Sequence, residues 1–282
     1  MSDASQPLPF IVSPPRDVSG WVTVLTRTDI PVLSSTAAAL EELRPNEDAV
    51  DAHMLAEALA GDPLMTLKLL RHVSARRSSR SLSEPETVTE AVLMLGIPPF
   101  FNAFQGLSTI DDRLGLHADA LAGAQSVLSR SERAARFALA FAVHRMDHDA
   151  AVIHEAALLH DFAEVLLWVN APDLALEISR RQSSDSSLRS AAVQRAVLNV
   201  ELGELQQALM RAWRLPELLI SISNDRTSPS PKVRNVQLAI RVARHSSRGW
   251  ENPAIPDDLA EIGDLLNLSL PHVRQLLIEL DE

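Results

Sequence analysis

Apolar residues recur along nearly the whole chain at the three- and four-residue spacing of an amphipathic helix. No segment shows the alternation of apolar and polar residues that marks a half-buried strand. The pattern therefore predicts an all-α fold, with two long helices at about 122–145 and 149–168 forming the centre of the core. Further helices are expected at about 32–43, 50–59, 63–75, 88–95, 188–213, 216–223, 231–245, 257–266 and 269–280.

Local signals at helix ends support this division. Asp62 precedes Pro63, and an Asp can accept the free amides of a first helical turn while a Pro at the first position loses no hydrogen bond. Thr87 and Glu90 have the spacing of a capping box, in which each side chain binds the other residue's amide. Gly96 is expected to end the helix that follows.

The composition narrows the class of protein. The chain has 282 residues, of which 46% are hydrophobic and 22% are charged, and it has no cysteine. Disulfides, thiolate metal sites and cysteine nucleophiles are therefore excluded. No apolar run reaches the roughly 18 to 20 residues of a membrane span, and the N-terminus lacks the features of a signal peptide. We expect a soluble, cytoplasmic protein with no membrane partner and a flexible tail over residues 1–20.

The negative net charge disfavours nucleic acid as a partner, although one segment of the chain is basic. The formal net charge is −11, whereas binding to phosphate backbones requires clustered cations. Residues 226–248 nevertheless contain six basic residues and no acid, and residues 251–282 contain eight acids and one Arg. These two segments could pair with each other. Alternatively, Arg234, Arg241 and Arg244 could line an anionic pocket for a nucleotide or an acidic partner, because guanidinium groups suit phosphate and carboxylate.

The strongest chemical candidate is an adjacent His160 and Asp161 at the end of an apolar helical run. Such a pair can offer an imidazole nitrogen and a carboxylate oxygen to one divalent ion, which could activate water on a phosphoester. Two ligands alone do not hold a catalytic metal. The structural alternative is that Asp161 accepts backbone amides or the proton of a histidine.

Several short motifs follow one another in a recognisable order over about residues 30–224. They are Ile30-Pro31, Asp62-Pro63-Leu64, Leu69-Leu70-Arg71, Ala91-Val92-Leu93-Met94-Leu95-Gly96, Leu158-Leu159-His160-Asp161 and Trp213-Arg214-Leu215-Pro216. In their order and spacing these motifs resemble the HDOD domain. That family is related to the HD metal-dependent phosphohydrolases, has generally lost part of their metal site, and is associated with bacterial signalling and regulation. The resemblance implies an HD-like helical bundle with an N-terminal helical subdomain.

The resemblance also implies a depleted active site. His160 and Asp161 match the central pair of the HD site, but no histidine stands near Arg130 or Ser131, where an upstream ligand would fall. The Gly and Lys that usually follow the central pair are Ala163 and Glu164 here, and the expected histidines near 199–202 and 223–225 are absent. We therefore expect no catalytic residue, no metal and no cofactor, and we interpret His160 and Asp161 as a vestigial pair.

These inferences give a domain scheme and a function. Residues 21–116 would form the N-terminal helical part, 117–225 the HD-like bundle, and 226–282 helices that pack on the bundle. The expected function is that of a non-catalytic bacterial signal-transduction protein that binds a ligand or a signalling protein, such as a cyclic-dinucleotide enzyme or a response regulator, and a homodimer is compatible with this. One alternative is a divergent phosphohydrolase that uses His160 and Asp161. Another is a transcriptional regulator acting through a C-terminal helical hairpin, whose second helix offers His272, Arg274 and Gln275 among acids.

Overall fold

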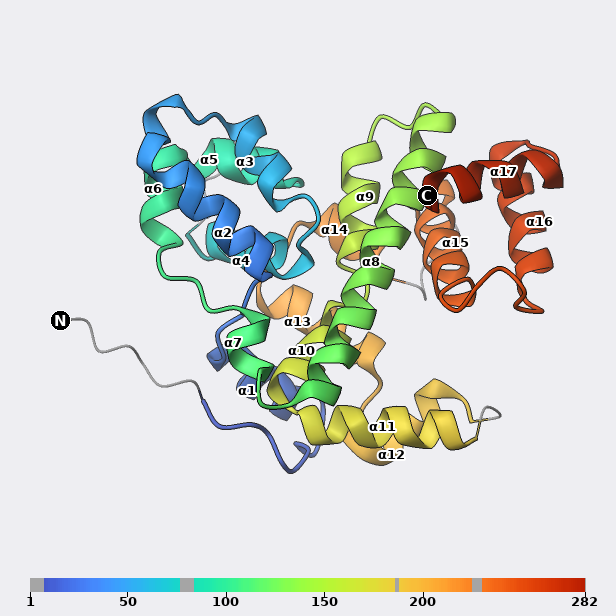
Figure 1. The fold of residues 1–282 in the computed structure, drawn as a ribbon, viewed down its shortest axis with the longest axis horizontal. Helices are drawn as coiled ribbons and strands as arrows, with labels where there is room; N and C mark the ends of the chain where they lie inside the picture. Colours follow the sequence, from blue (N-terminus) through green and yellow to red (C-terminus); the bar gives the residue numbers. More distant parts are fainter. Residues whose placement is uncertain (1–7, 77–83, 186–187, 225–229, 282) are drawn as a thin grey trace.

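The computed structural model describes residues 8–76, 84–185, 188–224 and 230–281. Within these ranges the chain is helical, with two isolated β-bridges and no strand. The predicted all-α fold, with an HD-like bundle and an N-terminal helical part, is confirmed (Figure 1). No helix within these ranges has both the length and the apolar composition needed to cross a membrane.

The N-terminal part is a group of short helices. Figure 1 shows α2 to α6 gathered at the upper left, with α1 and α7 lying lower, beside the bundle. The elements of this part are α1 (Val18–Arg27), α2 (Ser34–Leu43), the 3-10 helix η1 (Arg44–Ala49), α3 (Ala52–Leu59), α4 (Pro63–Arg76), α5 (Val88–Leu95), α6 (Ile97–Ala103) and α7 (Ile110–Leu114).

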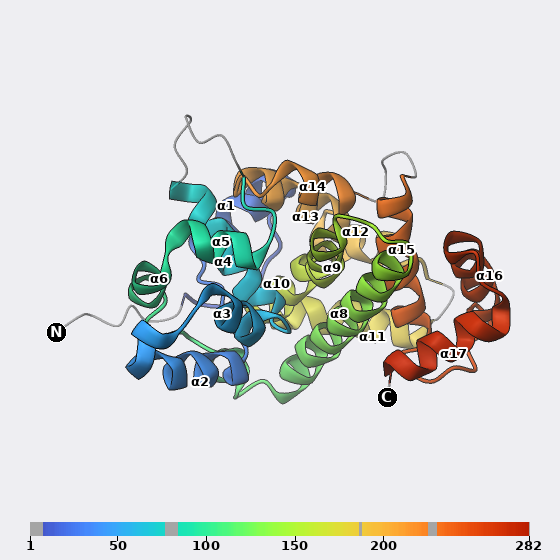
Figure 2. The ribbon, with the colours of Figure 1, turned by 90° about the horizontal axis from the view of Figure 1, so that it is seen from above.

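The bundle is organised around one long helix, α8, which packs against α9, α10 and α15. Seen from above, α8 runs between the N-terminal helices on one side and α15 to α17 on the other (Figure 2). The elements are α8 (Ala118–His144), α9 (Ala150–Leu158), α10 (Phe162–Asn170), α11 (Pro172–Ser184), α12 (Ser190–Leu198), α13 (Leu202–Ala212), α14 (Glu217–Ile222), α15 (Pro231–His245), α16 (Ile255–Leu266) and α17 (Leu270–Asp281).

Small residues on α8 bring its neighbours close. The helix buries a series of alanines, and small side chains at a contact shorten the distance between helix axes. At Gly123, an added Cβ would lie 2.6 Å from the Trp168 ring, so the indole of α10 rests directly on the backbone of α8. The buried alanines of α8 are Ala120, Ala124, Ala134, Ala135, Ala138 and Ala142.

One local helix signal acts as predicted and a second forms in part. Asp62 Oδ1 accepts hydrogen bonds of 2.9 Å from the amides of Leu64 and Met65. Thr87 Oγ1 accepts from the Glu90 amide at 3.2 Å. The reciprocal half of that capping box does not form, because the Glu90 carboxylate accepts from the amide of Glu86 instead.

Two predicted helices are each divided in the structure. The helix expected over 149–168 breaks into α9 and α10 at residues 159–161, and the one expected over 188–213 breaks after Leu198. Asn199 adopts the left-handed conformation at φ 66°, which ends α12. The apolar periodicity continues across both breaks, so it does not reveal them.

The structure also corrects the predicted N-terminal tail. Residues 1–7 lie outside the described residues, but α1 begins at Val18, and the Ile11 amide donates to the Asn170 carbonyl at 2.7 Å. Trp21 is fully buried, and its Nε1 donates to the Leu198 carbonyl at 2.9 Å. The segment from residue 8 to 20 is therefore attached to the bundle. Besides α1, the sequence patterns also missed α6, α7 and α11.

Ion pairs and backbone contacts attach the C-terminal helices. Arg133 of α8 donates to both carboxylate oxygens of Asp281, at 2.6 and 2.7 Å. At the other end of the hairpin, Arg145 donates to the Leu265 carbonyl and His144 contacts the Leu266 carbonyl. Both contacts satisfy carbonyls in the last turn of α16, which lack partners within the helix.

Candidate functional site

The break between α9 and α10 sets the position of the His160–Asp161 pair. Asp161 is the residue before α10, but its side chain makes no capping hydrogen bond to that helix. Its carboxylate is buried, and Oδ1 lies 2.9 Å from His160 Nδ1. Because the carboxylate does not cap its own helix, it is available to partners on neighbouring helices.

The main partner of Asp161 is Arg130, from the middle of α8. Arg130 Nε and Nη2 both donate to Asp161 Oδ2, at 2.9 and 2.7 Å. Arg130 Nη2 also donates to Glu164 Oε2 at 2.8 Å. The Arg130 and Asp161 side chains are only 16% and 11% exposed, so this is a largely buried ion pair. We call Arg130, Asp161 and Glu164 the arginine cluster.

The contacts within the arginine cluster shift the pKa values of its three side chains. Burial by itself would raise the pKa of Asp161, but the hydrogen bond from His160 and the charges of Arg130 and Arg244 hold it well below its usual value. Burial raises the pKa of Glu164 above its usual value, although Arg130 opposes this. Burial would lower the pKa of Arg130, but the two carboxylates raise it further above its ordinary value. Asp161 and Arg130 are therefore both charged at neutral pH.

The arginine cluster does not fit a catalytic metal ion. One oxygen of each carboxylate, Asp161 Oδ2 and Glu164 Oε2, accepts a hydrogen bond from Arg130, and the other Asp161 oxygen lies 2.9 Å from His160 Nδ1. Over the described part of the chain, no three His, Asp or Glu side chains come together as a metal-binding group. A divalent cation placed between these carboxylates would also meet the Arg130 guanidinium at close range, and like charges repel strongly where water is excluded.

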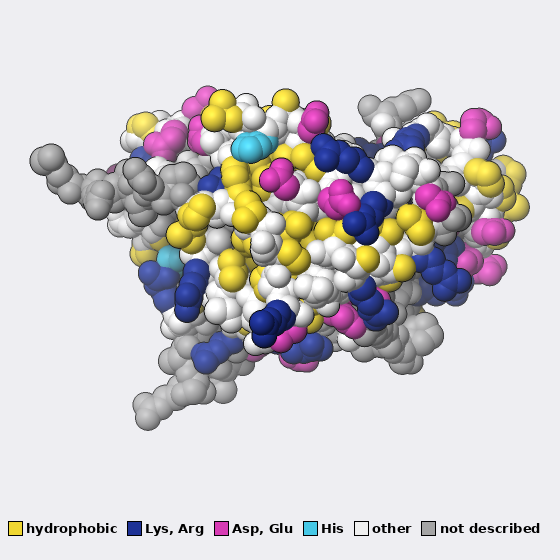
Figure 3. Space-filling model, turned by 90° about the horizontal axis from the view of Figure 1, so that it is seen from below, with side chains coloured by type: hydrophobic (Ala, Val, Ile, Leu, Met, Phe, Trp, Pro, Cys, Tyr) yellow, Lys and Arg dark blue, Asp and Glu magenta, His cyan; other side chains and the backbone are white. Residues whose placement is uncertain are grey.

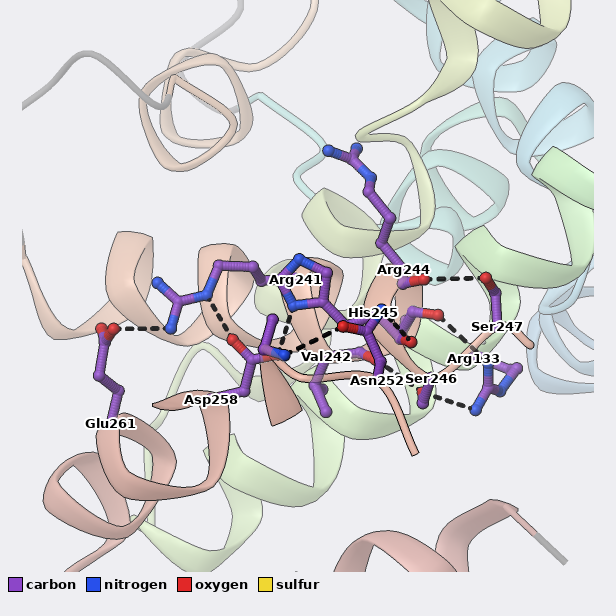
Figure 4. A network of polar contacts seen from close by, with 12 residues as sticks. Arg133, Arg241, Val242, Arg244, His245, Ser246, Ser247, Asn252, Asp258 and Glu261 are labelled. Atoms are coloured by element: carbon purple, nitrogen blue, oxygen red, sulfur yellow. Dashed lines mark hydrogen bonds and ion pairs between the residues drawn. The ribbon is translucent and has the colours of Figure 1, made fainter. Parts of the chain in front are cut away.

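The structure separates the three arginines that the sequence grouped on α15. Arg241 donates from Nε to Asp258 Oδ1 at 2.7 Å and from Nη2 to Glu261 Oε1 at 2.6 Å. Arg234 makes a long contact of 3.5 Å to the Glu261 carbonyl. Figure 4 shows Arg244 pointing away from this network. The hypothesis that Arg234, Arg241 and Arg244 line one pocket is therefore corrected, because two of them face α16.

The contacts of Arg241 agree with the alternative in which the basic residues of 226–248 pair with the acidic residues of 251–282. Asp258 is 1% exposed and is held between Arg241 and His245, whose Nδ1 lies 2.6 Å from Oδ2 (Figure 4). A buried carboxylate requires such partners, because an unpaired charge in the interior costs several kcal/mol. The basic face of α15 and the acidic face of α16 thus hold the hairpin onto the bundle.

Arg244 belongs instead to the surroundings of the arginine cluster. Its Nη2 lies 3.6 Å from Asp161 Oδ1, and its side chain is 54% exposed. It lines two cavities of about 490 and 570 Å³. The first also contains Arg130 and Trp168 and is called here the Trp168 cavity; the second contains the His160–Asp161 pair. They adjoin, because Glu164, Ser190, Gln194, Leu202 and Arg244 line both.

The sequence directs attention to His160 and Asp161 but indicates no role for Arg130 or Glu164. Arg130 stands where the resemblance would place a histidine ligand, and the sequence pattern gives it no other role. Glu164 follows Asp161 by three residues and shares its side of α10, which is the spacing that could have indicated a common partner. No signal in the chain indicates which helix supplies that partner.

Charged side chains are mixed on the face of the molecule that Figure 3 shows. On the face shown in Figure 3, basic and acidic side chains are interspersed with apolar ones. Among the described residues on that face there is no continuous basic band of the kind that follows a phosphate backbone.

Comparisons with known proteins agree with this fold. A family model described as the HDOD domain matches residues 30–229. The structure resembles the MmoQ response regulator from Methylococcus capsulatus, with a TM-score of 0.67 and 20% identity, over 89% of this chain and 98% of that one. It also resembles a virulence factor from Campylobacter jejuni, with a TM-score of 0.65 and 17% identity, over 89% and 90% of the two chains. Comparison with curated protein sequences gives no match.

Proposed function

The chain belongs to the HDOD domain family, and we propose that within it the protein is a non-catalytic binding module of bacterial signal transduction. On this proposal the HD-like bundle is retained as a scaffold, and its activity is recognition of a ligand or a protein. A fold can be kept while its chemistry is lost, because the site and the scaffold are separate features.

The observation that carries the proposal is the Arg130–Asp161 ion pair. A hydrolase of this type needs its aspartate free to coordinate a metal that activates water. Here the carboxylate is committed to two charge-assisted hydrogen bonds from a guanidinium. Releasing it would leave a buried Arg130 without its main partner, at a cost on the order of 3 to 5 kcal/mol.

The partner class comes from the resemblance to signalling proteins. The solved structure from Methylococcus capsulatus is described as a response regulator, which supports a place for this chain in signalling. We propose that the partner is a signalling protein, such as a cyclic-dinucleotide enzyme or a response regulator.

Turnover assays test the non-catalytic part of the proposal. The purified full chain is assayed for phosphatase and phosphodiesterase activity with Mn²⁺, Mg²⁺ or Fe²⁺, and its bound transition metal is measured by elemental analysis. We expect no turnover and less than about a tenth of an equivalent of metal, because the donor set is occupied by Arg130. Reproducible turnover that Asp161→Ala abolishes, and that the exposed control Asp119→Ala retains, would overturn the proposal.

A further inference from the structure

The Trp168 cavity has the size and the lining of a small-molecule site. Its volume of about 490 Å³ lies within the range of roughly 300 to 1,000 Å³ that is typical of such sites. Helices α8, α10 and α11 contribute apolar side chains, including Trp168. Helices α11 and α12 contribute hydroxyl and amide groups from Ser179, Gln182, Ser183, Ser190 and Gln194.

The cavity also carries basic charge that the described part of the protein does not neutralise. Of its three arginines, Arg130 is held by Asp161 and Glu164. Among the described residues, Arg244 has only the side-chain contact of 3.6 Å to Asp161. No ion pair or hydrogen bond involves the Arg248 side chain within the described ranges, and Glu164, the one acidic lining residue, is already bound to Arg130.

From these features we propose that the Trp168 cavity binds a nucleotide, with its phosphate held by Arg244 and Arg248 and its ring system held among Trp168 and the neighbouring apolar side chains. Two guanidinium groups suit a phosphate because each can donate two parallel hydrogen bonds. The hydroxyl and amide groups of α11 and α12 suit the polar edges of a base or a sugar. A nucleotide combines these chemistries in one molecule.

The apolar side of the cavity is formed before any ligand binds. Trp168 is 7% exposed, and its ring packs on Gly123 with no room for a Cβ between them. A side chain that is already fixed loses little entropy when a ligand binds against it. The ligand would therefore order mainly Arg244 and Arg248.

The proposed ligand connects to the arginine cluster through Arg244. An anion that binds Arg244 competes with Asp161 for the same guanidinium. This inference rests on the proposed function, because it names the ligand that a non-catalytic module would recognise beside its vestigial pair.

Calorimetric titration of the full chain tests the inference. The probes are adenosine and guanosine 5′-monophosphate, the two nucleosides, and inorganic phosphate. We expect at least one nucleotide to bind more tightly than its nucleoside and than phosphate, because only the nucleotide fills both parts of the cavity. Arg244→Ala and Arg248→Ala should each weaken binding about tenfold or more, since each removes charge-assisted hydrogen bonds.

Two further variants separate the cavity from the rest of the surface. Ser179 is exposed at the cavity, and Ser179→Trp should block binding while the melting temperature stays near that of the wild type. Arg274→Ala removes an exposed arginine on α17, away from the cavity, and should leave binding unchanged. No nucleotide binding, equal binding of phosphate alone, or binding that survives all three cavity variants would overturn the inference. Hydrolysis of a bound nucleotide would instead overturn the proposed function, so the two failures are distinguishable.

Discussion

Glu155 of α9 joins the bundle to the N-terminal helices, because its Oε1 accepts a hydrogen bond of 2.6 Å from the amide of Val88 at the start of α5. The Glu155 side chain is buried, and Oε2 has no hydrogen-bond partner within the described residues. Burial raises the pKa of Glu155 to about 8. The carboxyl is therefore protonated in the folded protein at neutral pH.

This contact predicts a pH-dependent stability. In the unfolded chain Glu155 ionises near its ordinary pKa of 4.5, whereas in the folded chain it keeps its proton to about 8. Its contribution to stability is thus fully present below about pH 4.5 and is lost as the pH rises to 8. The slope in that window is at most about 1.4 kcal/mol per pH unit.

Glu155→Gln removes this titration, and we expect its free energy of unfolding to fall less steeply between pH 5 and 8. Denaturation in urea at several pH values measures the slope. Glu57→Gln on α3, an exposed glutamate, is the matched control and should keep the slope of the wild type. Parallel pH profiles for the wild type and Glu155→Gln would contradict the assignment.

Arg130→Ala should destabilise the bundle by about 3 to 5 kcal/mol at pH 7, because it removes the cation shared by the largely buried Asp161 and the partly exposed Glu164. The loss should shrink below pH 4. Asp161 has a depressed pKa in the wild type, so the stability that this pair contributes is present at neutral pH and is lost as the carboxylate protonates. Urea denaturation at pH 7, and at pH values stepped down from 4 towards the depressed pKa of Asp161, measures both effects.

The control for Arg130 lies on the same helix. Arg136 is 46% exposed and pairs with Glu132, one turn away. Arg136→Ala should change stability by no more than about 0.5 kcal/mol. A loss below about 1 kcal/mol for Arg130→Ala would mean that the arginine cluster does not hold α8 to α10.

Arg241→Ala should lower stability by about 1 to 3 kcal/mol, because it removes one partner of the buried Asp258 carboxylate. Arg241→Glu should cost more, since it places a third acid beside Asp258 and Glu261. Thermal denaturation followed by circular dichroism measures both variants. Arg248→Ala is the control, because it breaks no ion pair within the described ranges. An Arg241→Glu protein as stable as this control would show that the contact between α15 and α16 contributes little to the stability of the fold.

Gly123→Ala should cost about 1 to 3 kcal/mol, because its methyl group would lie 2.6 to 2.7 Å from three Trp168 ring atoms and would force the indole or α8 to move. The fluorescence of the protein should change as well. Gly203→Ala on α13 is the matched control, since nothing lies within 4 Å of its added Cβ. The stability of Gly203→Ala should equal that of the wild type or exceed it by up to about 1 kcal/mol. Equal losses of stability in Gly123→Ala and Gly203→Ala would contradict the close contact between Gly123 and Trp168.

The sequence was informative where a helix is specified by its own residues. Asp62 caps the helix that begins at Pro63, because its carboxylate accepts hydrogen bonds from amides two and three residues further on. Apolar periodicity likewise depends only on which residues share a face of one helix. These short-range rules account for the all-α fold and for most helix positions.

Helix breaks and weakly patterned helices were harder to predict. Residues 18–27 form α1 although the segment contains Gly20 and several β-branched residues, which favour a helix little. What holds it is the burial of Trp21 against the carbonyl end of α12, which follows it by more than 170 residues. The break at residues 159–161 is hard to predict because apolar residues continue at helical spacing on both sides of His160 and Asp161.

By itself, the sequence determined the class of fold, the adjacency of His160 and Asp161, and the lack of a histidine near position 130. Only the tertiary structure decided that Arg130 would bind Asp161, that Arg241 would turn to Asp258, and that Arg244 would turn to the Trp168 cavity. The physical reason is the range of the interactions. Helix formation and capping act within about four residues, whereas Arg130 and Asp161 are 31 residues apart and meet only because α8 packs against α10 in one particular rotation.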